Sequence, residues 1–314
     1  MEIAPYQPVE HLVKDPFHLG RFGTLDNAIN HVLLATRTPA QVRALERKIL
    51  ALEQAEMPVI HRFSPGLYIR EISMPAGTVA IGHRQKTEHL NVLLKGRVRM
   101  VNANGQIDEL VAPMFFVAPP GQKLGYIVED MVWQNIYATT ETDIETLEAM
   151  FIEKDEVWQE DVAKRTRFVP LEVELDRMDY WRVLREFGIR HEVARAETEC
   201  KSDLISFPHG SYKVMVSDSL IDGRGLMATA NIATGEVIAP ARIDGKRTPA
   251  GRYTNHSPNP NAEFVVRQNG DLDLVAILAI QGNTGGRAGQ EITIDYRQAL
   301  NMRKQLCQQQ SQEQ

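Results

Sequence analysis

The feature that most constrains the fold is a series of short runs with a two-residue period between residues 66 and 137. Turns rich in Gly, Pro and Asn separate the runs, and the turn at residues 102–105, NANG, is a hairpin signal. Alternation of this kind puts one strand face on a core and the other on the surface. Regularly spaced short strands are typical of an antiparallel barrel or sandwich. The runs read LYIREISM, TVAIG, LNVLL, RVRMVN, MFFVA and VWQNIY.

A helix is predicted before these strands, in the segment TPAQVRALERKILALEQ. Thr38 has the N-cap position, Pro39 the first helical position, and Gln41 follows three residues after the cap, as in a capping box. Residues 1–35 are rich in Pro and His, and we expect a partly ordered lead-in there. The apolar face of the helix is predicted to consist of Val42, Leu45, Ile49 and Leu52.

Helical patterns return between residues 142 and 195. The segment TDIETLEAMFIEK begins with a capping-box pattern, Thr142 to Glu145, and DRMDYWRVLREFGI ends at Gly188, a typical helix stop. One face of the second helix is predicted to contain Met178, Trp181, Leu184 and Phe187. These helices are interpreted as a connector.

Strand-like runs resume after residue 206. They include YKVMV, EVIAPA, AEFVVR, LDLVAILAI and EITIDY, and NGD at residues 269–271 predicts a hairpin. The sequence thus predicts a mainly β protein with helical segments. Its expected parts are a lead-in and helix (1–57), a β-barrel (58–140), a helical connector (141–205), a second β domain (206–300) and a polar, disordered tail (301–314).

Length and composition exclude several classes. A chain of 314 residues favours two domains, and the net charge of −6 gives no general attraction to nucleic acid or anionic membranes. Two cysteines cannot make a disulfide framework or a cysteine-built zinc site. No run of 18 apolar residues and no secretory signal pattern occur, so a cytoplasmic protein is expected.

Three motifs in the second β region resemble those of the SET domain, the fold of most protein-lysine methyltransferases. They are GRGLMA (223–228), RYTNHSPNPN (252–261) and GQEITIDY (289–296), with NIATGEVI (231–238) after the first. The resemblance covers about residues 208–300. It implies a β-clip fold in which the second and third motifs cross in a knot-like arrangement. It also implies methyl transfer from S-adenosylmethionine to a protein lysine.

The resemblance also implies individual roles. Tyr296 is expected to be the catalytic tyrosine, and Tyr253 an aromatic residue beside the cofactor pocket. In-line methyl transfer depends on alignment and desolvation, and the attacking lysine must first become a neutral amine, which burial favours. Cofactor binding is expected at Arg224, Gly225, Leu226, Asn255, His256 and Tyr296. For Asn255 and His256, a turn or a satisfied core histidine is the structural alternative.

The sequence departs from the family pattern in three ways. Pro258 replaces the cysteine that follows the NHS triplet, and no cysteine-rich segment follows Tyr296. About 13 residues separate Ile238 from Arg252, where the family inserts a longer subdomain that forms a wall of the substrate-lysine channel. A partner subunit or the N-terminal domain would have to supply this wall. A helix after Tyr296, RQALNMRKQL, is expected to close the pocket.

The N-terminal barrel resembles the cupin fold through GHRQKTEHLNVLLKG and FFVAPPGQKLGY. The positions of the metal ligands in that family fall on His83, Gln85, His89 and Leu124. Two imidazoles and an amide are a thin ligand set for zinc or iron, so no metal is expected, with His83 and His89 as the weak candidates. The barrel is interpreted as a structural or dimerising module, or as a pocket for a small organic ligand.

Three functions follow from these patterns. The first is a SET-type lysine methyltransferase. The second is a non-catalytic assembly protein, since a degenerate cupin joined to a minimal SET unit is similar to uncharacterised bacteriophage proteins, which would place it in the host cytoplasm or in a virion. The third, a metabolite-processing cupin enzyme, is disfavoured by Leu124. The expected partners are a protein substrate or assembly partner and a second copy through the barrel, with no nucleic acid and no membrane.

Overall fold

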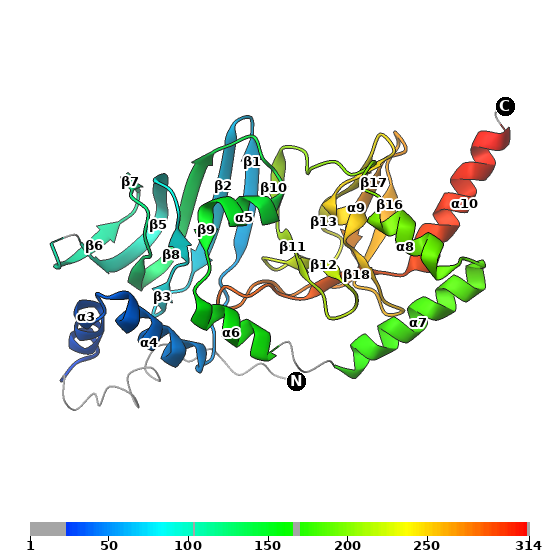
Figure 1. Ribbon diagram of the computed structural model, residues 1–314. Coiled ribbons are helices and arrows are strands. Elements are labelled where there is room, and N and C mark those ends of the chain that lie inside the picture. Colours follow the sequence, from blue (N-terminus) through cyan, green and yellow to red (C-terminus); the bar gives the residue numbers. More distant parts are fainter. Residues whose placement is uncertain (1–22, 103, 166–169, 313–314) are drawn as a thin grey trace. The chain divides into compact units, whose positions relative to one another are not determined.

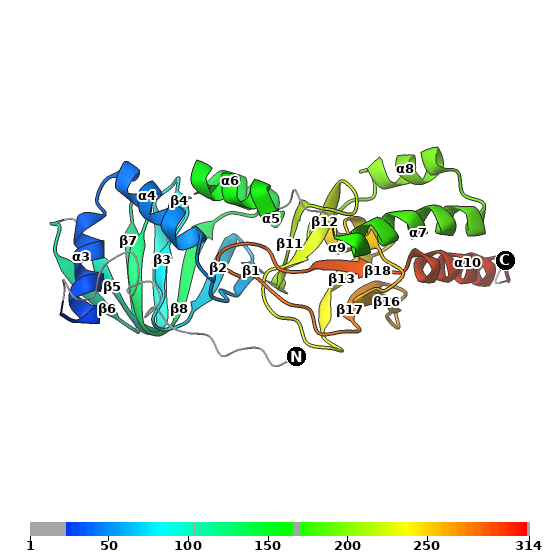
Figure 2. The ribbon, with the colours of Figure 1, turned by 90° about the horizontal axis from the view of Figure 1, so that it is seen from below.

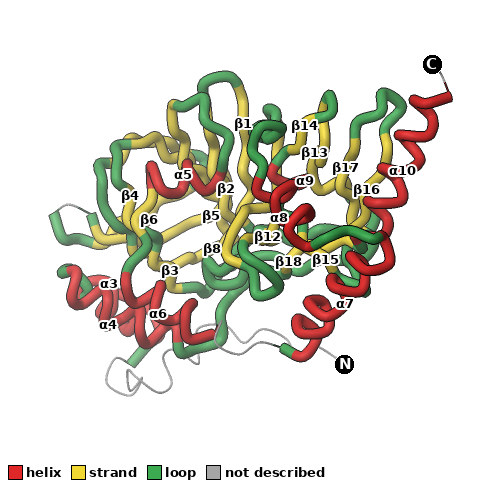
Figure 3. Tube along the Cα trace, turned by 45° about the vertical axis from the view of Figure 1, so that its right-hand side comes forward, coloured by secondary structure: helices red, strands yellow, loops and turns green. Residues whose placement is uncertain are grey.

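The computed structural model describes residues 23–102, 104–165 and 170–312 of the chain, and shows a mainly β protein with helices (Figure 1; Figure 3). The described residues form two compact units. Unit 1 consists of the residues up to Glu141, Thr146–Arg165 and Thr284–Arg287. Unit 2 consists of Thr142–Glu145, the described residues 170–283, and those from Ala288 onward.

Unit 1 is built on an antiparallel sheet whose strands follow the order β1-β2-β8-β5-β6, with β3 paired to β8 and β7 to β5. The short strands β4 and β9 form a separate antiparallel pair. The strands are β1 (Val59–Ser64), β2 (Leu67–Met74), β3 (Val79–Ile81), β4 (Arg84–Gln85), β5 (His89–Val101), β6 (Ile107–Val111), β7 (Met114–Ala118), β8 (Leu124–Ala138) and β9 (Ile152–Glu153).

Two long strands, β5 and β8, shape this sheet, and β8 has 15 residues. β5 has 13 residues and pairs β7 through its first half and β6 through its second, with shifts of register against β8 between Leu93 and Val98. Such irregularities bend strands and increase their twist. The predicted barrel is therefore corrected to an open, bent sheet. A barrel would need β1 to pair with β6, and these two strands are not paired among the described residues. Its core cluster is Leu93, Val98, Ile127, Met131 and Trp133.

The helices of unit 1 include α3 (Leu25–Ala35), α4 (Pro39–Leu50) and α6 (Glu156–Arg165), while α5 (Ile144–Phe151) spans the boundary of the two units. The capping box at Thr38 and Gln41 is confirmed. The prediction of a partly ordered lead-in was wrong for α3, because Ile29 and Leu33 bury an apolar face and the helix contacts β5, β6 and β8. Residues 1–22 of that lead-in lie outside the described residues.

Unit 2 contains two four-stranded sheets, ordered β11-β12-β18-β15 and β14-β13-β17-β16 (Figure 2). The NGD hairpin is confirmed, since it joins β16 to β17 with Gly270 at φ +86°. The strands are β10 (Gly210–Tyr212), β11 (Val214–Asp218), β12 (Arg224–Ala228), β13 (Val237–Ile243), β14 (Lys246–Arg247), β15 (Asn255–His256), β16 (Ala262–Val266), β17 (Leu272–Ala276) and β18 (Glu291–Ile294).

The helices of unit 2 are α7 (Leu171–Phe187), α8 (His191–Glu199), α9 (Pro249–Arg252) and α10 (Tyr296–Gln312). Gly188 ends α7 in the left-handed conformation, as predicted. The apolar face predicted for α7 was wrong at Met178 and Trp181, which are 58% and 51% exposed. α10 continues to Gln312, into the segment expected to be a disordered tail. None of the described helices has the length and apolar character needed to cross a membrane.

The core of unit 1 offers a matched test of this fold. Leu93 is fully buried in the cluster, whereas its neighbour Leu94 is 46% exposed on the other strand face. We expect Leu93→Ala to lower the free energy of unfolding by roughly 2–5 kcal/mol, because it leaves a cavity. Leu94→Ala should cost less than about 1 kcal/mol. Urea unfolding of both variants measures the difference, and equal costs would contradict this packing.

Candidate functional site

The central feature of unit 2 is the parallel pairing of β15 with β18. Asn255 lies opposite Thr293 and His256 opposite Ile294, and the Ser257 N–H donates to the Ile294 carbonyl over 3.0 Å. The two strands are far apart in the sequence, and each is followed by a loop or helix that contributes polar groups. The segments that the sequence singled out are thus neighbours.

Tyr296 begins α10 one residue after β18 ends, and it is held at two atoms by His256 of β15 and by Thr254, just before β15. Its backbone N–H donates to His256 Nδ1 over 3.2 Å, and its phenol O–H donates to the Thr254 carbonyl over 3.1 Å. The centres of the His256 and Tyr296 rings lie 5.2 Å apart. Burial raises the pKa of the Tyr296 phenol well above its ordinary value, so the phenol stays protonated and acts as a donor.

His256 is held in one tautomer. Since Nδ1 accepts the Tyr296 N–H, Nε2 carries the proton and donates to Asp179 on α7 over 3.1 Å. Asp179 also accepts from Arg297 Nη1 over 2.6 Å. Hydrogen bonding by Arg297 in particular keeps the pKa of Asp179 below its ordinary value. The imidazole side chain is therefore fully engaged with protein groups.

Asn255 is also engaged, in a network with Glu291 and Ser219. Its side-chain amide donates to Glu291 Oε1 over 2.7 Å and to Ser219 Oγ over 3.0 Å. A Cβ on Gly225 would lie 2.3 Å from Glu291 Oε1, so the glycine makes room for this network. Burial is the largest effect on Glu291 and raises its pKa.

The remaining residues expected at the cofactor differ in their surroundings. Arg224 pairs with Glu145 over 2.7 Å, and the side chain of Leu226 is fully buried in the sheet. Tyr253 lies under the guanidinium of Arg252, with 5.0 Å between that group and the ring centre. Arg252 Nε is buried and has no hydrogen-bond partner among the described residues.

Arg252 and Tyr180 are two residues whose importance the sequence analysis missed. Tyr180, on α7, packs edge-on against Tyr296 with 6.2 Å between ring centres. Arg252 was visible at the start of the second motif, but its unpaired, buried nitrogen is a property of the fold. Tyr180 gave no signal, because the long-range packing of α7 decides its position. Together with Tyr253 and Tyr296 they combine aromatic rings with one cation.

In unit 1 the predicted metal positions carry other contacts. His89 Nδ1–H donates to the Thr87 carbonyl, so its Nε2 accepts, and its partner there is the Lys123 ammonium at 3.2 Å. Gln85 Oε1 accepts the Tyr137 O–H over 2.5 Å, and Leu124 pairs with Ile81. A positively charged amine takes the nitrogen that a metal would need, so this donor set does not fit a metal ion. Groups of three or more potential metal ligands are absent from the described parts of the chain.

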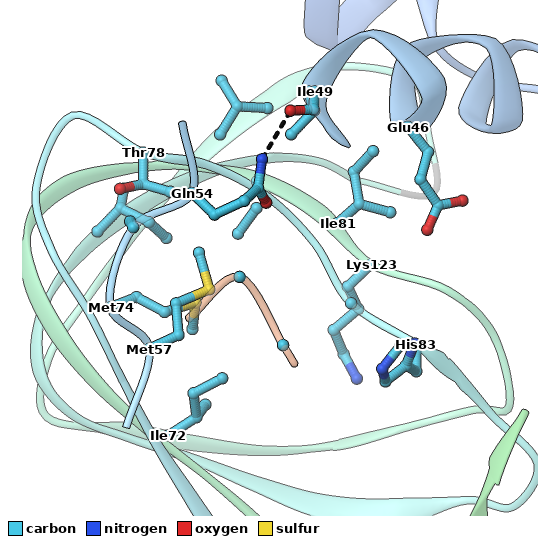
Figure 4. A pocket seen from close by; sticks show the side chains of 18 of the residues that line it. Glu46, Ile49, Gln54, Met57, Ile72, Met74, Thr78, Ile81, His83 and Lys123 are labelled. Carbon is cyan, nitrogen blue, oxygen red and sulfur yellow. Dashed lines mark hydrogen bonds between the residues drawn. The ribbon is translucent and has the colours of Figure 1, made fainter. Parts of the chain in front are cut away.

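Unit 1 contains a cavity of about 750 Å³ beneath α4 and the bent sheet (Figure 4). In Figure 4 the Lys123 amine and the His83 ring lie beside one another, while Met57, Ile72 and Met74 lie at the other side. A volume of this size is typical of pockets for small organic molecules. The wall is mostly apolar.

No protein-family model matches the chain, and no curated protein matches it. Solved structures of cupin-fold proteins resemble about 30% of the chain. An acetylacetone dioxygenase from Acinetobacter johnsonii shares 15% identity over 28% of this chain and 63% of its own, with a TM-score of 0.23. A cupin-2 domain protein from Shewanella frigidimarina shares 13% identity over 32% of this chain and 98% of its own, with a TM-score of 0.23.

Glu46 on α4 gives a pH-dependent prediction. It lines the cavity, is 6% exposed and has a buried Oε2 without a partner among the described residues. Burial, with a smaller effect of Asp155, raises its pKa to about 7. Because the folded protein holds this proton more tightly than the unfolded chain, Glu46 lowers the stability as the pH rises from about 4.5 to about 7.

We therefore expect Glu46→Gln to gain up to about 3 kcal/mol in unfolding free energy, relative to the wild type, between pH 4 and pH 8. Urea unfolding at both pH values measures this. Glu53→Gln, at an exposed position nearby, should show no such gain. A Glu46→Gln difference that does not change with pH would contradict the assignment.

Proposed function

We propose that unit 2 is a SET-type methyltransferase module that transfers a methyl group from S-adenosylmethionine to a lysine amine of a protein. The parallel pairing of β15 with β18 carries the proposal, because it sets the NHS segment against Tyr296. The cofactor would supply a methyl group on a positively charged sulfur. The protein would supply alignment and a dry surrounding, which account for most of the catalysis in such a displacement.

The residues around Tyr296 fit this cofactor. The buried, unpaired Arg252 Nε can hold a carboxylate, such as that of the methionine portion. The rings of Tyr180, Tyr253 and Tyr296 suit a positively charged sulfur and an incoming amine, since aromatic faces attract cations. These features favour a methyl donor that carries both a negative carboxylate and a positive sulfur.

Tyr296 would position the acceptor amine. Its hydroxyl keeps its proton, because burial raises its pKa, and donates to the Thr254 carbonyl. The hydroxyl oxygen and the carbonyl can both face an amine N–H, and so aim the amine lone pair at the methyl carbon. Asn255 and His256 would act through their backbone and as supports, since their side chains are already hydrogen-bonded.

A second candidate is the non-catalytic assembly role. The specific observation in its favour is that the side chains of Asn255 and His256, and the space at Gly225, are all used by protein groups. If the pairing of β15 with β18 serves packing alone, these contacts between protein groups are sufficient. Cofactor binding separates the two candidates.

Calorimetry with S-adenosylhomocysteine, the demethylated product, tests the proposal. Wild-type protein should bind it, and Arg252→Met should weaken binding at least about tenfold, because the carboxylate loses a charged hydrogen bond. Arg185→Met, at an exposed position on α7, is the matched control and should bind normally. Absence of wild-type binding up to millimolar ligand would refute the methyltransferase and leave the assembly role.

Tyr296→Phe tests the catalytic step. It should slow transfer of a labelled methyl group to lysine peptides roughly 100-fold, because it removes one positioning group, while leaving S-adenosylhomocysteine binding nearly unchanged. Single-turnover rates and calorimetry on the same preparation measure the two quantities. Full activity in Tyr296→Phe would contradict the role assigned to this residue.

A further inference from the structure

The cavity of unit 1 is independent of the methyl-transfer proposal and has its own chemistry. A volume of about 750 Å³, partly open to solvent, lies between the bent sheet, α4 and Gly285 and Gly286 of the segment Thr284–Arg287. This segment lies between β17 and β18 in the sequence, yet it packs in unit 1, where the Gly285 N–H donates to the Ala55 carbonyl over 2.8 Å. A Cβ on Gly285 would lie 2.5 Å from Gln54 Oε1, so only glycine allows this approach. A distant part of the chain thus forms part of the cavity wall.

Most of the wall is apolar and flexible. Methionine side chains adapt to ligands of irregular shape, and the aliphatic groups beside them favour an apolar body. The apolar part of the wall includes Met57, Ile72, Met74, Val98, Met100, Ile127 and Met131.

One end of the cavity carries two basic side chains. Lys123 Nζ contacts the neutral His89 ring over 3.2 Å, and Lys123 has no carboxylate beside it among the described residues. The buried Arg70 Nε has no hydrogen-bond partner in the part of the chain that the structure describes, although Arg70 interacts electrostatically with Glu148. Both residues line the cavity. This end therefore offers the Lys123 ammonium and the Arg70 Nε–H as donors.

Unused donors lie at the same end. His83 packs edge-on against Trp158 with 5.0 Å between ring centres, and the buried Trp158 Nε1–H has no hydrogen-bond partner among the described residues. Burial lowers the pKa of His83 to about 4, so its ring is neutral at physiological pH. A buried N–H without an acceptor costs free energy, and an incoming oxygen would remove that cost.

Acidic groups complete the charge inventory of the cavity. Glu46 lies on α4 at its upper rim in Figure 4, and Glu53 is exposed to solvent. Because burial raises the pKa of Glu46 to about 7, it is partly protonated near neutral pH. Glu148 is paired with Lys154 over 2.8 Å and also interacts with Arg70, and Asp155 acts on both Glu46 and His83. Lys123 is the basic group at this end that has no acid beside it among the described residues.

We propose that this cavity binds a small amphipathic monocarboxylate, with its carboxylate at Lys123, Arg70 and Trp158 and its apolar body against the methionine-rich wall. The carboxylate would accept hydrogen bonds from the three donors, of which two have no other partner. The Lys123 ammonium would then take the place that a metal ion would need beside His89. The ligand would be bound through charge and apolar contact, and no bond would be broken.

Calorimetry of the full chain with decanoate, below its micelle concentration, tests the proposal. Decanoate should bind, and decanol, which has the same apolar body without charge, should bind at least about tenfold more weakly. Tryptophan fluorescence, through Trp133 and Trp158 in the wall, gives a second readout. Equal binding of acid and alcohol, or no binding of decanoate, would overturn the proposal without affecting the methyltransferase proposal.

Variants sharpen this test. Lys123→Met should weaken decanoate binding at least about tenfold and leave decanol binding nearly unchanged, while Lys123→Arg should preserve preference for the acid. Lys95→Met, at an exposed position on β5, is the matched control and should bind as the wild type does. Thermal unfolding confirms that each variant is folded, and the comparison of acid with alcohol in the wild type stands without any variant. Unchanged decanoate binding by Lys123→Met would contradict the assignment.

Discussion

Unit 2 depends on a buried carboxylate, Asp179, that binds two partners from separate parts of the chain. It accepts from His256 Nε2 on β15 and from Arg297 Nη1 on α10. A buried charge is tolerated only when it is paired and hydrogen-bonded, so these contacts fix α7, β15 and α10 in one arrangement. Because Asp179 accepts the hydrogen bond from Nε2–H, the proton stays on Nε2 and His256 Nδ1 is free to accept from the Tyr296 N–H. The start of α10, and with it the tyrosine, is positioned by this chain of contacts.

The same chain of contacts shows why the sequence predicted some features and missed others. The Thr38 capping box and the stop at Gly188 depend on groups a few residues apart, so their patterns are readable locally. The face of α7 was predicted from apolar periodicity and was wrong, because Asp179 is buried by its polar partners while Met178 and Trp181 are exposed. The face that α7 buries is decided by the contacts of Asp179 with His256 and Arg297, which are far away in the sequence and leave no local pattern.

The resemblance to the SET family implied a knot-like crossing of the second and third motifs. The structure pairs β15 with β18 in parallel, and the crossing itself stays a prediction. Composition and periodicity alone would not have predicted this pairing, since NHS reads equally well as a turn. The roles of individual residues were less accessible. The missing Cβ of Gly225 accommodates Glu291, and the unpaired nitrogen of Arg252 is visible in the folded chain alone.

In unit 1, counting along the cupin-like motifs led to Leu124, a position without a ligand group. The adjacent Lys123, just before β8, contacts His89 instead, with 3.2 Å between Nζ and Nε2. The predicted barrel is a bent sheet, and the cavity beside it is lined in part by Gly285 and Gly286 from a distant segment. The sequence could indicate the strands of this unit, but it could not indicate which distant residues line its cavity.

Hydrogen–deuterium exchange with and without S-adenosylmethionine locates the bound cofactor along the chain, and so tests whether the paired β15 and β18 hold it. We expect slower exchange of the backbone amides in residues 252–257 and around Tyr296, with no change in β1–β8 of unit 1. Exchange that stays the same throughout unit 2 at saturating cofactor, or that slows in unit 1 instead, would contradict this expectation.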